Sequence, residues 1–142
     1  METNDASAAA EILAVLEAEA KAFWEKDMAA FSRCWGSDTF VSRGGWWPRG
    51  GVAWQRGWSE ISALIRSHFA ANPEVNPSAQ EVRRENLVLR IGKDMAWATF
   101  DQYAPATGED DMDMPGLSHE TRIFEKRDGR WVIVHVGYLL VG

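Results

Sequence analysis

Apolar residues recur every three or four positions in the first half of this 142-residue chain, a pattern typical of amphipathic helices. The clearest instance runs through Ile12, Leu16, Ala20 and Phe23. Another apolar stripe ends before Asn72-Pro73, a pair that stops a helix. Three helices are therefore predicted, over 7–26 with Asp5 or Ser7 as the cap, over 28–35, and over 58–71.

After Pro77 the pattern changes to the alternating and continuous apolar runs of β-strands. Long strands are predicted at 82–91, at 96–103, and on both sides of 127–129 within 120–140. A short strand is expected at 39–42, and the Gly- and Trp-rich segment 44–57 is expected to be an irregular loop with room for one short strand near Val52. Helices followed by a series of antiparallel strands indicate a single α+β domain over residues 1–142.

The turn at 127–129 decides which side chains of the last two strands share a face, because a one-residue change of register turns every side chain over. A two-residue loop, Asp128-Gly129, would place Arg122 opposite His135. A three-residue loop with a left-handed glycine would place Arg122 opposite Val134, and we favour it. The two faces then hold Glu120, Arg122, Phe124, Val132, Val134, Val136 and Tyr138 on one side, and Trp131, Ile133 and His135 on the other.

Composition argues against several classes of function. The formal net charge of −6 disfavours nucleic-acid binding, although arginines and tryptophans that could stack on single-stranded bases are interleaved between 43 and 58. The chain has no apolar run of membrane-spanning length and no signal-peptide pattern at its start. Its one cysteine, Cys34, excludes an internal disulfide and is expected to be a small buried hydrophobe. We therefore expect a cytoplasmic protein that binds neither nucleic acid nor membrane and uses no cofactor.

Four segments of the chain together resemble one protein family. They are Ala22-Phe-Trp-Glu-Lys-Asp27, Cys34-Trp-Gly-Ser-Asp38, Ile91-Gly-Lys-Asp-Met-Ala-Trp97, and the stretch from Glu120-Thr-Arg to Trp-Val-Ile-Val-His135. This combination resembles the NTF2-like superfamily, specifically its SnoaL-like and ketosteroid-isomerase-like branch. The terminal hairpin is also similar to the association domain of calcium/calmodulin-dependent protein kinase II. The resemblance implies a cone, in which a strongly curved antiparallel sheet wraps N-terminal helices around a pocket, and a homodimer formed through the outer sheet face.

Arg122 is the strongest candidate for a ligand contact in such a pocket. A guanidinium inside an apolar cone keeps its proton and needs an anionic partner. That partner could be a ligand carboxylate held through two parallel N–H bonds, or Glu120, two residues earlier on the same face, in a structural ion pair. The resemblance to the association domain places Arg122, Gln102 and Tyr138 at cavity positions. The predicted pocket residues are Trp24, Trp54, Phe100, Gln102, Glu120, Arg122 and Tyr138.

The opposite face of the sheet is expected to carry the dimer interface, formed by Trp97, Thr99, Tyr103, Trp131, Ile133 and His135. His135 is thus expected to face a partner or solvent rather than to act as a general base. No metal site is expected, because His68 and His119 have no acidic or cysteine neighbours at ligand spacing. The acidic cluster from Glu109 to Asp113 lacks the residue order of a calcium loop and is expected to be solvated.

The residues do not support the chemistry of the enzymes that the chain resembles. In ketosteroid isomerases a carboxylate base lies on the first strand after the second helix, and that position holds Arg43, which cannot abstract a carbon-bound proton at neutral pH. Their carbonyl-polarising tyrosine falls near Glu19. Epoxide-opening members need two carboxylates and an arginine around one water, and only Glu120 and Arg122 are available. The sequence therefore predicts a pocket protein for a small apolar or aromatic ligand with an acidic group, with catalytic residues unassigned, or alternatively an association module acting through the outer sheet face.

Overall fold

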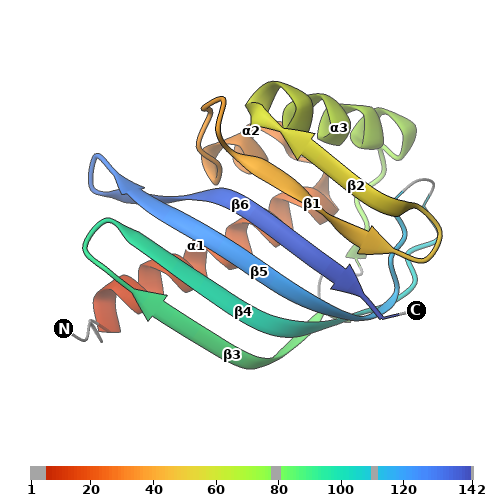
Figure 1. The fold of residues 1–142 in the computed structure, drawn as a ribbon. Helices are drawn as coiled ribbons and strands as arrows, with labels where there is room; N and C mark the ends of the chain where they lie inside the picture. The colour runs from red at the N-terminus through yellow and green to blue at the C-terminus, as the bar shows by residue number, and fades with distance from the viewer. Residues whose placement is uncertain (1–5, 78–80, 110–111, 142) are drawn as a thin grey trace.

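The chain folds into helices packed on one side of a single β-sheet (Figure 1). The computed structural model describes residues 6–77, 81–109 and 112–141. The helices in these residues are α1 (Ala6–Glu25), α2 (Met28–Arg33) and α3 (Gly57–Ala71). The strands are β1 (Ser42–Trp47), β2 (Gly51–Arg56), β3 (Arg83–Ile91), β4 (Met95–Ala104), β5 (Gly116–Arg127) and β6 (Arg130–Leu140).

The six strands form one curved, open sheet in the order β2-β1-β6-β5-β4-β3. Neighbouring strands are antiparallel except β1 and β6, which run parallel. Figure 1 shows α1 crossing behind β4, β5 and β6, and α3 lying beside β1 and β2. The helices therefore cover the inner face of the sheet and leave the outer face open. The predicted α+β architecture is confirmed.

Helix boundaries agree with the sequence prediction to within two residues. α1 begins at Ala6, so Ser7 lies inside the helix and is not its cap, and Asp5 lies outside the described residues. Asp27 caps α2, where its carboxylate accepts a hydrogen bond of 3.0 Å from the Ala30 backbone N–H. No helix in the described ranges is both long and apolar enough to cross a membrane.

The segment 44–57 lies largely in a β-hairpin, so its prediction as an irregular loop was wrong, although the short strand expected near Val52 is present as β2. β1 pairs with β2 from Ser42↔Arg56 to Trp47↔Gly51. The strand expected at 39–42 therefore overlaps β1 only at Ser42. Gly44 and Gly45 interrupt the alternation that marks a strand in sequence. The parallel pairing of β1 with β6 stabilises the strand instead, and no local pattern predicts that pairing.

The β5–β6 turn has two residues, and the predicted three-residue loop was wrong. Asp128 and Gly129 both adopt positive φ, 52° and 77°, and Arg127 pairs with Arg130. This two-residue turn matches the right-handed twist of the flanking strands. A bulge farther along the hairpin then shifts the register, because Ile123 pairs with His135 whereas Phe124 pairs with Ile133. Arg122 consequently lies opposite Val136, neither Val134 nor His135.

The two-residue turn also brings the first part of β6 to the inner face, because it pairs Phe124 with Ile133 and Lys126 with Trp131 before the bulge is reached. Trp131 and Ile133 are 2% and 0% exposed and belong to the hydrophobic core, so their predicted place on the outer face was wrong. Beyond the bulge the predicted facing holds, since Glu120 pairs with Tyr138 on the inner face. The extra residue in β6 shifts the alternation of side chains by one position. Odd-numbered residues such as Ile133 therefore face inward before the bulge, and even-numbered residues such as Tyr138 face inward after it.

Cys34 lies in the core at the end of α2, as the sequence predicted. Burial raises the pKa of its thiol to about 11, with a further contribution from the nearby negative charge of Glu19. The thiol is therefore protonated at neutral pH and is a packing residue rather than a nucleophile.

Candidate functional site

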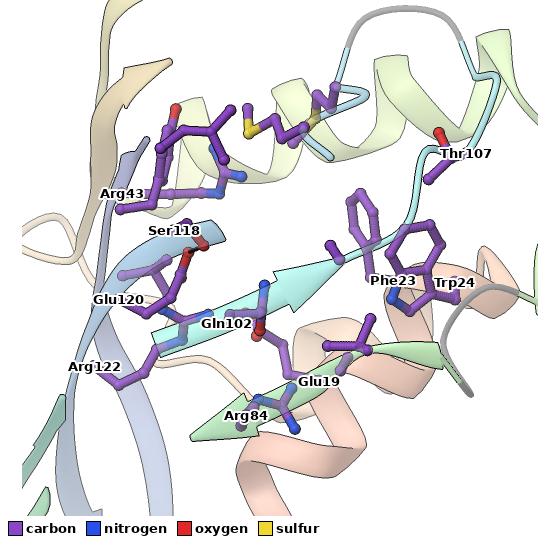
Figure 2. Close-up of a pocket in the computed structure, with 18 of the residues that line it drawn as sticks. Glu19, Phe23, Trp24, Arg43, Arg84, Gln102, Thr107, Ser118, Glu120 and Arg122 are labelled. Atoms are coloured by element: carbon purple, nitrogen blue, oxygen red, sulfur yellow. Dashed lines mark hydrogen bonds and ion pairs between the residues drawn. The ribbon is translucent and has the colours of Figure 1, made fainter. Parts of the chain in front are cut away.

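A cavity of about 140 Å³ lies between the helices and the inner face of the sheet (Figure 2). An engineered cavity of about 150 Å³ holds benzene, so this space accepts a small ligand. The apolar part of its wall is formed by Ala20, Phe23, Trp24, Phe31, Ile65, Val82, Ala104, Pro105, Met112, Met114, Val136 and Leu140, and polar and charged side chains form the rest. The wall therefore favours an apolar or aromatic body.

Charged side chains from four different elements also reach this cavity. Arg43 comes from β1, Arg84 from β3 and Arg122 from β5, whereas Glu19 comes from α1 and Glu120 from β5. Figure 2 shows these side chains around the same space as Gln102. Charges in a partly desolvated site need a partner of opposite sign. A charged side chain that lacks such a partner therefore indicates the charge that a ligand has to carry.

Arg122 and Glu120 balance each other. Arg122 Nη1 donates to Glu120 Oε1 over 2.7 Å, and both side chains are more than nine-tenths buried. The second carboxylate oxygen of Glu120 accepts a hydrogen bond of 2.5 Å from Ser118 Oγ. The guanidinium also lies over the Phe100 ring, 5.2 Å from its centroid. Of the two partners that the sequence allowed for Arg122, the structure contains the internal ion pair.

Arg84 is balanced from outside the cavity. Its Nη1 forms an ion pair with Glu17 of α1, and its guanidinium lies 5.6 Å from the centroid of Phe100, the ring that Arg122 also contacts. Burial lowers the pKa of Arg84, an effect that the negative charge of Glu17 opposes. Sequence analysis missed Arg84, although it pairs with Gln102 and alternation along both strands places the two side chains on one face.

Arg43 is the cation of the cavity that has no ionic partner within residues 6–77, 81–109 and 112–141. None of the ion pairs found among the described residues includes it. Its guanidinium lies 5.2 Å from the centroid of the Tyr138 ring. The close approach of β1 to β6 depends on Gly45, where an added Cβ would overlap the backbone carbonyl of Tyr138. Gly44 and Gly45, which made this strand hard to predict from the sequence, therefore allow β1 to pair with β6, and this pairing places Arg43 at the cavity.

Glu19 is the carboxylate of the cavity that has no ionic partner in the described part of the chain. Its Oε2 accepts a hydrogen bond of 2.8 Å from the indole Nε1 of Trp35. That neutral donor fixes the orientation of the carboxylate without compensating its charge.

The structure brings five of the seven predicted pocket residues to the cavity wall, namely Trp24, Gln102, Glu120, Arg122 and Tyr138. Phe100 is buried between two guanidiniums and supports the wall without lining it. Trp54 was placed wrongly, because β2 turns it to the outer face, where it is 47% exposed. Its ring lies 5.7 Å from that of His135.

His135 lies on the outer face, within hydrogen-bonding distance of Ser42, with 2.8 Å between its Nδ1 and Ser42 Oγ. Burial, and then the positive charge of Arg122, lower the pKa of His135 in spite of its contact with Ser42. Trp97 and Thr99 lie on this face as well, since cross-strand pairing aligns them with Ile123 and Thr121. His135 is therefore separated from the cavity by the sheet.

Glu109 is not the solvated residue that the sequence indicated. Its Oε2 accepts hydrogen bonds from Lys26 Nζ at 2.6 Å and from Asn76 Nδ2 at 3.1 Å, and its Oε1 lies 3.2 Å from His68 Nε2. Burial alone would raise the pKa of Glu109, but the contacts with Lys26 and Asn76 outweigh it and the pKa is lowered. The predicted acidic loop is thus tied to the helical layer at Glu109, and its residues 110 and 111 lie outside the described residues.

A curved sheet that holds helices on one face, with a cavity between them, defines the class of α+β cones to which this fold belongs. The sequence matches the SnoaL-like domain over residues 12–138, and the chain belongs to this family. No curated protein matches it in sequence.

Several solved structures share the fold. A cystatin-like fold protein from Burkholderia xenovorans is 21% identical, with a TM-score of 0.72 over 100% of this chain and 98% of that one. A protein of unknown function from Pectobacterium atrosepticum is 21% identical, with a TM-score of 0.70 over 98% and 94%. An NTF2-like protein of unknown function from Pseudomonas putida is 17% identical, with a TM-score of 0.71 over 95% and 87%. These identities are low, so the likeness shows the fold alone.

Proposed function

We propose that this protein binds a small apolar or aromatic molecule with one acidic group in the cavity of the cone. The observation that carries the proposal is Arg43, a cation without an ionic partner among the described residues, beside the apolar part of the cavity wall. A ligand carboxylate would supply the missing negative charge through two parallel N–H bonds. Gln102 and Arg122 offer further donors at the same cavity.

A general base must be a group that accepts a proton near the substrate, and Glu120 is occupied on both oxygens by Arg122 and Ser118. Arginine cannot take that role at position 43. Glu120 and Arg122 thus form an internal ion pair, and Glu19 is the carboxylate of the cavity that keeps one oxygen outside the described hydrogen bonds.

Binding is tested by thermal unfolding and tryptophan fluorescence with 3-phenylpropanoate and 4-methylpentanoate, each compared with its neutral amide. A ligand that binds only the folded state at about one hundred times its dissociation constant stabilises it by about 2.7 kcal/mol. We expect the acids to raise the melting temperature and the amides to leave it unchanged. Equal shifts with acids and amides, or no shift with either, would contradict the proposed role of the cavity.

A second candidate function, association through the outer sheet face, is favoured by exposed apolar residues on that face. Trp46, Val52, Trp54, Val88, Trp97 and Leu139 are each between 40% and 81% exposed. Cross-strand pairing groups them in rows, for example Leu139 with Trp46 and Val52. Large exposed apolar residues grouped in this way are typical of a protein–protein contact.

Leu139→Glu is expected to dissociate a homodimer formed through this face, because an unpaired carboxylate in an apolar interface is costly to desolvate. Sedimentation velocity measures the change. Val75→Glu is the matched control, since Val75 is 64% exposed, lies between α3 and β3 and adds the same charge away from the sheet. A wild-type monomer, or a dimer that survives Leu139→Glu, would exclude this interface.

A further inference from the structure

In the part of the chain that the structure describes, the ionisable side chains of the cavity leave one charge of each sign outside any ion pair. Arg122 is paired with Glu120 at 2.7 Å, and Arg84 is paired with Glu17. The two groups left over are Arg43 and Glu19, neither of which takes part in an ion pair within the described ranges. A ligand with a single acidic group would balance Arg43 and leave Glu19 without a direct ionic partner, with only the nearby positive charge of Arg84 to offset it.

Arg43 and Glu19 approach the cavity from opposite sides. Arg43 lies on β1 at the edge formed with β6, whereas Glu19 lies on α1, and Figure 2 shows Gln102 between them. Trp35 holds one oxygen of Glu19, and none of the described hydrogen bonds uses the other oxygen. A ligand that meets both groups must therefore carry its two charges at opposite ends.

We propose that the cavity takes a small amino carboxylate, with the carboxylate bound by Arg43 and an amine at the far end bound by Glu19. This inference rests on the proposed acid-binding function and adds the second polar group of the ligand. The apolar wall with Phe23 and Trp24 holds the body between the two ends. A cavity of about 140 Å³ accepts a body of about the size of benzene.

The test uses three molecules with the same aromatic body, namely 4-(aminomethyl)benzoate, 4-methylbenzoate and 4-methylbenzylamine. Their dissociation constants are measured by calorimetry with the wild-type protein and with Glu19→Gln. A charge-assisted hydrogen bond strengthens binding by about ten-fold or more. We expect 4-(aminomethyl)benzoate to bind at least about ten-fold more tightly than 4-methylbenzoate in the wild-type protein, and this difference to disappear in Glu19→Gln.

Glu19→Gln keeps an oxygen that can accept the hydrogen bond from Trp35, so its fold should be preserved. Glu11→Gln is the matched control, because Glu11 is an exposed residue of the same helix that does not line the cavity. The Glu11→Gln variant should prefer 4-(aminomethyl)benzoate over 4-methylbenzoate by the same factor as the wild-type protein. A preference lost equally in Glu11→Gln would assign the effect to overall charge and overturn the role of Glu19.

The remaining outcomes separate the two proposals. If 4-(aminomethyl)benzoate and 4-methylbenzoate bind equally well to the wild-type protein, the amine site is wrong and acid binding stands. If neither acid binds, acid binding fails, and the inference that rests on it fails as well.

Discussion

Glu120→Gln is expected to lower the free energy of unfolding by about 3–5 kcal/mol, because it leaves the buried guanidinium of Arg122 without its counterion. Both side chains are less than one-tenth exposed, so water replaces the lost partner less well than it would at the surface. For a domain of this size the loss corresponds to a melting temperature lower by roughly 10–15 °C. Urea unfolding at neutral pH measures the difference.

The same strand supplies a matched control. Glu125 and Arg127 repeat the spacing of Glu120 and Arg122, and their ion pair has the same length, 2.7 Å, but is more than a quarter exposed. Glu125→Gln should cost at most about 1 kcal/mol, since exposed ion pairs contribute little. Arg127 also keeps Asp38 as a partner.

A double variant separates the charge from the packing. Glu120→Leu combined with Arg122→Met removes both charges together, so its stability should lie within about 1–2 kcal/mol of the wild-type value. If Glu120→Gln unfolds like the wild-type protein, the pair is not the buried ion pair that we describe.

Arg43→Gln is expected to weaken the binding of 3-phenylpropanoate by about 10- to 100-fold, because a charge-assisted contact with the carboxylate is lost. The melting temperature of the free protein should change little, since no ion pair among the described residues includes Arg43. This combination distinguishes Arg43 from Arg122, whose substitution would leave Glu120 buried and uncompensated. Calorimetry and thermal unfolding on the same samples measure both quantities.

Arg56→Gln controls for the change in net charge. Arg56 ends β2, is exposed, and pairs with Ser42 on the outer side of the hairpin. Its substitution should leave the affinity for the acid within about two-fold of the wild-type value, because exposed charges are screened by salt. An Arg43→Gln variant that binds the acid as tightly as the wild-type protein would remove the observation on which the proposed function rests.

The pair of Glu120 and Arg122 was accessible from the sequence for a simple reason. The two residues are separated by one position, and alternation puts them on the same face of any strand, whatever that strand pairs with. Arg84 was accessible in principle by the same rule through its pairing with Gln102. Arg43 was noticed only as an obstacle to isomerase chemistry, because its strand was hidden by Gly44 and Gly45.

In the β5–β6 hairpin, the predicted inward facing of Glu120 and Tyr138 is correct, although the three-residue turn from which it was predicted is not. The turn is two residues long, and a bulge between the pairs of Ile123 and Phe124 restores the facing of Glu120 and Tyr138. The two-residue turn sends Trp131 and Ile133, which precede the bulge, into the core, where the sequence placed them outside. No periodicity marks a single extra residue in a strand whose side chains are apolar on both faces.

The sequence by itself determined the α+β class, the long helices, the four C-terminal strands and the shared face of Glu120 and Arg122, since each depends on the spacing of residues close together in the chain. Only the tertiary structure decided that β1 pairs with β6, that the outer face carries Trp54, and that Arg43 and Glu19 reach one cavity. These features join residues far apart in the sequence, and their energies come from cross-strand contacts and burial that no local pattern contains.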